Sequence, residues 1–360
     1  MALGVLFGLG FAGMAPGQEP ANRQESPTSA VGRVPTAAVE DIKAIDDEYD
    51  RQLRELERRR LEQLAQLAAR QKPDAAAGTY ERLFRLAVAA NLFGDAETAA
   101  KAVLDAGSPS PVAMGLAYTV RIIAEVDRGA TEQSLETLRE AIADRAKAAN
   151  AGAPRVDLPT DEAVEICDAY YQRLLQGAHY EAAAKGLRLL LEHTRRPILK
   201  EFLSSRLRRL EVVGKAAPAI RGVDLDGKPF DLAELKGKKA VLVVFWASWC
   251  LPCQAEVESL RTVEETYRAR GLQIVGINLD PLSAVDAKSV SVLPNVRRFL
   301  LDNNVTWPTL VNGQGDKDYA AAYGGAEVPA NVLVGRDGTV VNIDLVRKNL
   351  DPMIARELGR

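Results

Sequence analysis

The chain has 360 residues, of which 47% are hydrophobic and 26% are charged, so it can form two or three folded domains. Its formal net charge of −3 shows no excess of the basic residues that bind nucleic-acid phosphates, so we expect no nucleic-acid partner. Three cysteines are too few for a small fold stapled by several disulfides.

Residues 1–36 are predicted to be a leader followed by a disordered linker. The first 15 residues are apolar and uncharged, too short to span a bilayer but long enough for the core of a secretory signal. The usual positive start is missing, because the first basic residue is Arg23, so a plain disordered leader is the alternative. We favour export, which predicts an extracytoplasmic or periplasmic location over a cytoplasmic one. Residues 16–36 are rich in Pro, Gly, Gln and Ser, which is typical of a linker.

Residues 37–72 form the next predicted segment, a single amphipathic helix over 39–70. Its apolar side chains recur every three or four residues. Such a stripe either pairs with a second copy in a coiled coil or docks on its own domain. Since no strict seven-residue period is kept, we favour docking, and self-association through 39–70 remains the alternative. The stripe comprises Ile42, Ile45, Tyr49, Leu53, Leu56, Leu61, Leu64 and Leu67.

Residues 77–212 are predicted to form an all-α domain. Two stretches within it, 91–104 and 174–187, each pair a Gly-containing turn with an Ala-rich helix. They resemble helical hairpins of the tetratricopeptide type, although two weak copies fall short of an array. Such a region either holds a peptide or only orients the next domain, and we favour the second role. Cys167 falls on an apolar helical stripe there, which predicts a buried structural thiol.

Residues 213–360 alternate between strand and helix patterns, which predicts an α/β fold. A hairpin is indicated at Asp226-Gly227. After it we expect strand 240–247, helix 251–270, strand 272–279, helix 296–304, and strands 307–311, 330–335 and 339–345 before a final helix.

The sequence Cys250-Leu-Pro-Cys253 lies between a buried, β-branched strand and an amphipathic helix. The free N–H groups and the dipole at a helix start stabilise a thiolate, the species that attacks disulfides. The motif therefore predicts thiol–disulfide exchange. We assign Cys250, at the helix start with its sulfur exposed, as the nucleophile. Cys253, one turn deeper, resolves the mixed disulfide.

Other uses of two nearby cysteines fit this chain poorly. A structural zinc site needs four ligands, but the only further cysteine is Cys167, and His179 and His193 are not in ligand spacing with the pair. A c-type haem site needs a histidine directly after the motif, where Gln254 stands. We therefore expect neither a metal nor another cofactor.

The stretch from Val213 to Arg360 contains an ordered series of motifs: Asp226-Gly-Lys-Pro-Phe-Asp-Leu232, Leu235-Lys-Gly237, Phe245-Trp-Ala-Ser-Trp-Cys-Leu-Pro-Cys253, Trp307-Pro308, Tyr323-Gly324, Val328-Pro329 and Val334-Gly-Arg-Asp-Gly-Thr339. With these motifs it resembles the TlpA/ResA-like branch of the thioredoxin superfamily, which implies a thioredoxin-like fold for these residues. General thioredoxins carry a buried Asp six residues before the first cysteine, where this chain has Val244. The TlpA-like branch instead has an acidic residue three positions after the second cysteine, here Glu256.

The resemblance also implies roles for residues around the thiols. Glu256 would accept the proton of Cys253, and a cis peptide at Val328-Pro329 would pair with an extended client segment. Trp249 would form an apolar collar beside the disulfide.

The branch acts mostly outside the cytoplasm and reduces disulfides of client proteins, so a client and an upstream thiol donor are the implied partners. The alternatives are a helical protein-binding scaffold with an accessory redox switch and, least favoured, a peroxidase. The peroxidase would need Thr or Ser at the position of Ala247.

Overall fold

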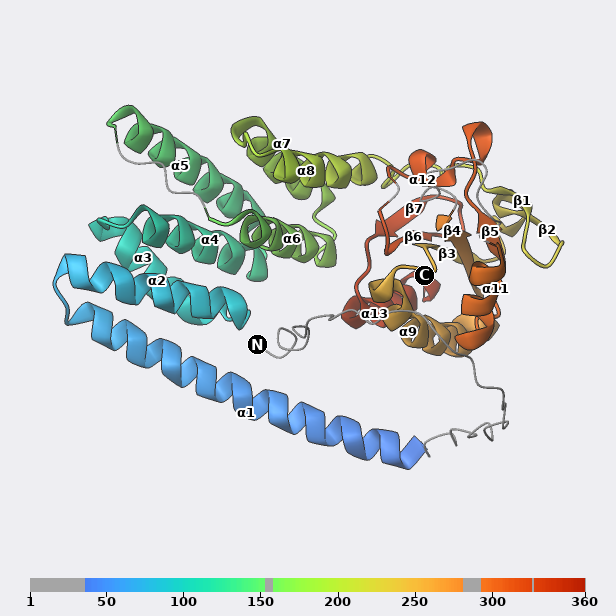
Figure 1. Cartoon of the computed structure of the whole chain (residues 1–360), viewed down its shortest axis with the longest axis horizontal. Coiled ribbons are helices and arrows are strands. Elements are labelled where there is room, and N and C mark those ends of the chain that lie inside the picture. The colour runs from blue at the N-terminus through green and yellow to red at the C-terminus, as the bar shows by residue number, and fades with distance from the viewer. Residues whose placement is uncertain (1–35, 153–157, 281–292, 326, 360) are drawn as a thin grey trace, which may run out of the picture. The chain divides into compact units, whose positions relative to one another are not determined.

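The computed structural model describes residues 36–152, 158–280, 293–325 and 327–359 (Figure 1). The predicted leader, and almost all of the linker that follows it, lie outside these residues. None of the described helices is long and apolar enough to cross a membrane. The chain comprises two compact units, Met1–Val120 and Arg121–Arg360. The boundaries predicted at 72 and 212 remain predictions.

The first unit is helical. It contains α1 (Thr36–Ala69), α2 (Pro73–Ala89), α3 (Phe93–Ala106) and the start of α4 (Pro111–Asp127). The second half of α1 packs on α2 and buries Leu61 and Ala68, as expected for a docked helix. Between residues 45 and 56, the apolar side chains of Ile45, Tyr49 and Leu56 are more than half exposed. Docking therefore accounts for only part of the predicted stripe.

The second unit begins with the end of α4 and continues with α5 (Thr131–Asn150), α6 (Thr160–Gln176), α7 (Tyr180–His193) and α8 (Pro197–Leu210). Cys167 on α6 is a buried free thiol, as predicted, and burial raises its pKa to about 12. The two similar stretches adopt the same turn: Asn91 and Ala178 both have positive φ, and the next residue donates a backbone hydrogen bond of 2.8 Å to the residue five positions before it.

Residues 213–359 of the second unit form the predicted α/β fold. The strands are β1 (Arg221–Val223), β2 (Pro229–Asp231), β3 (Ala240–Trp246), β4 (Leu272–Asn278), β5 (Thr309–Val311), β6 (Ala330–Val334) and β7 (Val340–Ile343). The α-helices are α9 (Leu251–Tyr267), α11 (Leu293–Asp302), α12 (Tyr319–Ala322) and α13 (Arg347–Leu358). Short 3₁₀ helices are η1 (Leu232–Leu235), η2 (Arg268–Arg270) and η3 (Gly315–Lys317).

The central sheet has the strand order β5-β4-β3-β6-β7. β3 is parallel to β4 and antiparallel to β6, so it lies in the middle with a partner on each side. All seven of its residues are buried, which is why the sequence has an unbroken apolar run there. One face packs on α9 and α13, through Leu242, Leu260 and Ile354 among others. On β3, the ring of Phe245 contacts that of Tyr323 at 5.6 Å between centroids.

The element boundaries lie within three residues of the predicted ones. α9 ends at Tyr267 rather than at residue 270, and α11 spans Leu293–Asp302 rather than 296–304. β5 begins at Thr309 rather than at residue 307, directly after Pro308, a residue that has no backbone N–H for a sheet ladder. The hairpin at Asp226-Gly227 joins β1 to β2, and Gly227 has φ of 82°, a conformation that glycine adopts without a steric penalty.

Candidate active site

The two cysteines lie at the junction between β3 and α9. β3 ends at Trp246, and Cys250 is the N-cap residue of α9. Its Sγ accepts a hydrogen bond of 3.1 Å from the backbone N–H of Cys253. Pro252 lies in the first helical turn, where its missing N–H has no intrahelical partner to lose. The strand–CxxC–helix arrangement predicted from the sequence is therefore present.

The structure is that of the oxidised form, with a disulfide between Cys250 and Cys253. Each cysteine is only 4% exposed, so the exposure predicted for Cys250 is wrong in this state. The disulfide joins the two sulfurs, and apolar side chains surround both cysteines. This cluster includes Trp246, Ala247 and Val296, with Leu225, Phe299, Leu300 and Val328 packed against it.

A small cavity lies behind the disulfide, with about 20 Å³ of space for a water-sized molecule, which is enough for one water. Cys253, the half-buried Glu256 and Pro329 all line it, and Val244 contributes to its apolar wall. Glu256 is therefore beside the second cysteine. Apolar residues complete the lining: Trp246, Val257, Leu260, Phe299, Leu300, Val305 and Trp307 among them.

The loop before β6 forms another wall of the site. The Val328–Pro329 peptide bond is cis, as expected, and Val328 packs on the cysteine cluster. On the outer side, Trp249 is 60% exposed and Leu251 is 76% exposed. The structure thus brings five of the six predicted site residues together at one cluster or cavity and leaves Trp249 on the adjacent surface.

Sequence reasoning missed Asp280, whose buried carboxylate holds the turn before Cys250. It accepts a hydrogen bond of 2.8 Å from the backbone N–H of Ser248 and another from the Ser248 hydroxyl. Asn278 donates to the same carboxylate at 2.6 Å. A signal existed: β3 and β4 are parallel, so polar residues just after β4 lie at the same sheet edge as the cysteines.

The comparisons with known proteins concern this same domain. Residues 212–356 match the family model described as Redoxin. The thiol-disulfide oxidoreductase ResA of Bacillus thuringiensis (strain Al Hakam) is 31% identical over 129 residues, which cover 36% of this chain and 67% of the relative. The ResA of Bacillus subtilis (strain 168) is 27% identical over 130 residues, covering 36% of this chain and 65% of the relative.

The chain belongs to the ResA-like family of thiol-disulfide oxidoreductases. Among solved structures, a thiol:disulfide interchange protein of the thioredoxin family from Chlorobium tepidum TLS is 28% identical, with a TM-score of 0.34, and the match covers 40% of this chain and 96% of that one. The family assignment rests on the sequence relatives. It extends to the domain that carries the cysteines, and the helices before residue 212 lie outside it.

Proposed function

We propose that this chain is exported and reduces disulfide bonds in client proteins. The observation that carries the proposal is the Cys250–Cys253 pair at the start of α9. Val328 packs on this pair, and Cys253, Glu256 and Pro329 line one cavity beside it. The apolar leader at residues 1–15 supports a location outside the cytoplasm. We favour reduction over oxidation because the Leu251-Pro252 loop holds no cation that would over-stabilise the reduced pair.

The exchange proceeds in two steps. The Cys250 thiolate attacks one sulfur of a client disulfide, forming a mixed disulfide and releasing a client thiolate. The Cys253 thiol then gives its proton to Glu256 and attacks the Cys250 sulfur, which closes the Cys250–Cys253 disulfide and releases the second client thiolate. Two electrons pass to the client. An upstream thiol donor must return them before the next cycle.

A redox titration of the full-length chain tests the direction. The chain is equilibrated in buffers of reduced and oxidised dithiothreitol or glutathione, and the disulfide fraction is measured by thiol alkylation and mass. We expect a midpoint near the value of about −270 mV that is typical of thioredoxin. A midpoint near about −120 mV, that of a strong oxidant, would assign the chain to disulfide formation instead.

We also propose that the chain self-associates through residues 39–70, by way of the exposed apolar stripe of α1 that contains Tyr49 and Leu53. The charges on this helix are unevenly distributed. Residues 44–50 carry four acidic and no basic side chains, whereas residues 51–60 carry five arginines and two glutamates. An antiparallel pair would place each acidic half beside the other copy's basic half, and would pair the stripe with itself.

A further inference from the structure

The end of α8 lies directly against the loop that leads to the cis proline. Gly324 has φ of 93°, and a Cβ on it would come within 2.8 Å of the backbone of Arg208 and of the Cα of Arg209. Any side chain at Gly324 would therefore push the loop off the helix. The two backbones touch because this position is a glycine.

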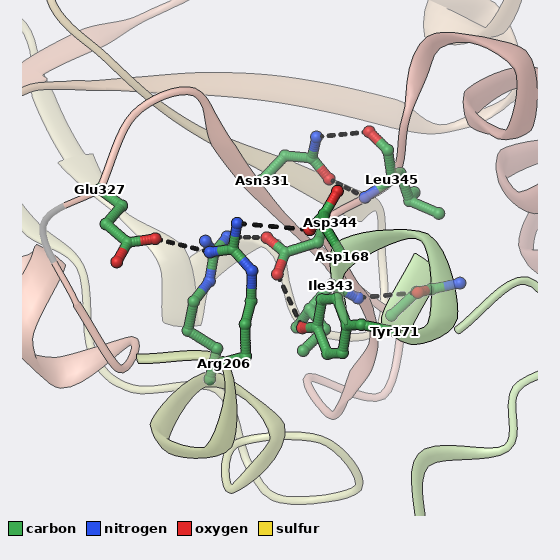
Figure 2. Close-up of polar contacts among 10 residues, drawn as sticks. Asp168, Tyr171, Arg206, Glu327, Asn331, Ile343, Asp344 and Leu345 are labelled. Atoms are coloured by element: carbon green, nitrogen blue, oxygen red, sulfur yellow. Dashed lines mark hydrogen bonds and ion pairs between the residues drawn. The ribbon is translucent and has the colours of Figure 1, made fainter. Parts of the chain in front are cut away.

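Arg206, two residues before Arg208 on α8, forms an ion pair with the same loop. Its Nη1 lies 2.6 Å from an Oε of Glu327, the residue before Val328, as Figure 2 shows. Its Nη2 lies 3.6 Å from Asp168 on α6. The Arg206 side chain is only 16% exposed and its guanidinium sits 4.7 Å from the Phe202 ring centroid, so it has little freedom to move. One arginine thus joins two helices to the proline loop.

A second contact fixes the strand on the other side of the proline. Asp344 pairs with Arg209 of α8 and accepts a hydrogen bond of 2.8 Å from the Tyr171 hydroxyl of α6. The backbone N–H of Asp344 donates to the carbonyl of Asn331, two residues after Pro329, at 2.9 Å. The Asn331 side chain in turn makes two hydrogen bonds of 2.8 Å with the backbone of Leu345 (Figure 2).

We propose that Arg206 is a positioning residue for client binding and that α6 and α8 brace the proline loop from outside. The proposal rests on the proposed function, because it assumes that Val328 and Pro329 receive the client. The disulfide and Glu256 lie on elements that Arg206 does not contact through any of the bonds above. Loosening the brace should therefore weaken the binding of an extended client and leave the chemistry of the dithiol intact.

Two probes separate these effects in the full-length chain. One is a two-cysteine peptide with a fluorophore and a quencher on either side of its disulfide. The other is 5,5′-dithiobis(2-nitrobenzoic acid), a small disulfide that needs no backbone pairing. The chain is reduced beforehand, freed of reductant and followed for a single turnover. For Arg206→Gln and Glu327→Gln, we expect KM for the peptide, taken as the concentration that gives half the maximal single-turnover rate, to rise about fivefold, with the maximal rate and the rate with the small disulfide unchanged. The double variant should be no worse than Arg206→Gln alone, because that variant has already lost the Arg206–Glu327 contact.

Arg208→Gln is the matched control. Arg208 lies on the same helix but pairs with Glu201 on the surface, where both side chains are at least half exposed, so its loss should change neither probe. An Arg206→Gln chain with an unchanged peptide KM would overturn the positioning role, as would an equal loss on both probes. A wild-type chain that reduces neither probe would contradict the proposed function itself, and the positioning role with it.

Discussion

Glu256 and Cys253 both border one small cavity whose other lining residues are mostly apolar. The carboxylate therefore belongs to a residue beside the thiol that must lose its proton before it can attack. This shared cavity is the structural support for treating Glu256 as the proton acceptor of the second step.

Glu256→Gln should slow the resolution of the mixed disulfide at neutral pH by about tenfold or more, since a positioned base contributes at least that much. The difference should close at alkaline pH, where the thiol ionises without help. Stopped-flow measurement of client-thiol release against pH checks this. The matched control is Glu258→Gln on the exposed face of α9. Superimposable pH–rate profiles for the wild type and Glu256→Gln would make Glu256 an ordinary helix residue.

The thiol pair could be predicted at this scale because its signal is local: four residues of sequence hold both cysteines, the proline and the helix start. Glu256 and Val328-Pro329 followed from family position. The role of Asp280 was not predicted because it is 32 residues from Ser248 in the sequence. A single carboxylate in a sequence does not indicate which residue it will bind. The buried state of Cys250 escaped because it depends on the oxidation state and on Val296 and Val328, which come from other elements.

Among the elements, α1 combines two environments in one helix. Its C-terminal part packs on α2, whereas Ile45, Tyr49, Leu53 and Leu56 form an apolar stripe that is exposed in the structure. Large exposed apolar patches of this kind commonly mark interaction sites. The acidic and basic halves make a second copy in antiparallel orientation the partner that fits both the stripe and the charge.

Tyr49→Arg should convert a dimer of the full-length chain into a monomer, because it places a positive charge in the apolar seam opposite the arginines of residues 51–60 in the other copy. Light scattering during size-exclusion chromatography measures the mass directly. Leu67→Arg is the control: Leu67 is also half exposed on α1, but it lies beyond the reach of an antiparallel partner centred near residue 51. A wild-type chain that is monomeric at high micromolar concentration would refute the pairing.

Periodicity explains why the elements themselves were predictable. The apolar run at 240–246 indicates a covered strand because it is short and β-branched, and the spacing of the stripe of α1 indicates a helix. Periodicity says which face of an element is apolar, but it does not say what covers that face. For this reason the sequence left docking and self-association of residues 39–70 both open, and the structure assigns docking to one half of the helix only.

Across the whole molecule, polar contacts between distant segments join α6 and α8 to the thioredoxin-like fold. Tyr171 and Asp344 are separated by 173 residues, and Arg206 and Glu327 by 121. Such pairs cannot be predicted from the spacing of residues within one helix or loop, because each member is an ordinary polar residue on its own element. The sequence therefore predicted the two folds but none of the contacts between them.

Asp344→Asn should lower the free energy of unfolding by about 3–5 kcal/mol, because it leaves Arg209 buried without its charge partner. The Arg209 and Asp344 side chains are 5% and 7% exposed. Asparagine tolerates the positive φ of 51° at this position, so the backbone is not the cause of the loss. Urea unfolding followed by tryptophan fluorescence measures it, since all three tryptophans lie in residues 246–307.

Glu201→Gln gives the reference value for that experiment. It removes the exposed partner of Arg208 and should change the free energy of unfolding by less than about 0.5 kcal/mol. Equal unfolding midpoints for Asp344→Asn and Glu201→Gln would show that the buried pair does not hold these segments together.

The central claim is that Cys250 attacks the client and Cys253 resolves the intermediate. Trapping tests it most directly: full-length Cys253→Ser and Cys250→Ser chains are incubated with oxidised client peptide or with cell-envelope extract and run on non-reducing gels. We predict that Cys253→Ser accumulates covalent complexes that disappear on reduction, and that Cys250→Ser forms none. Equal trapping by the two variants, or trapping by Cys250→Ser alone, would contradict the assignment.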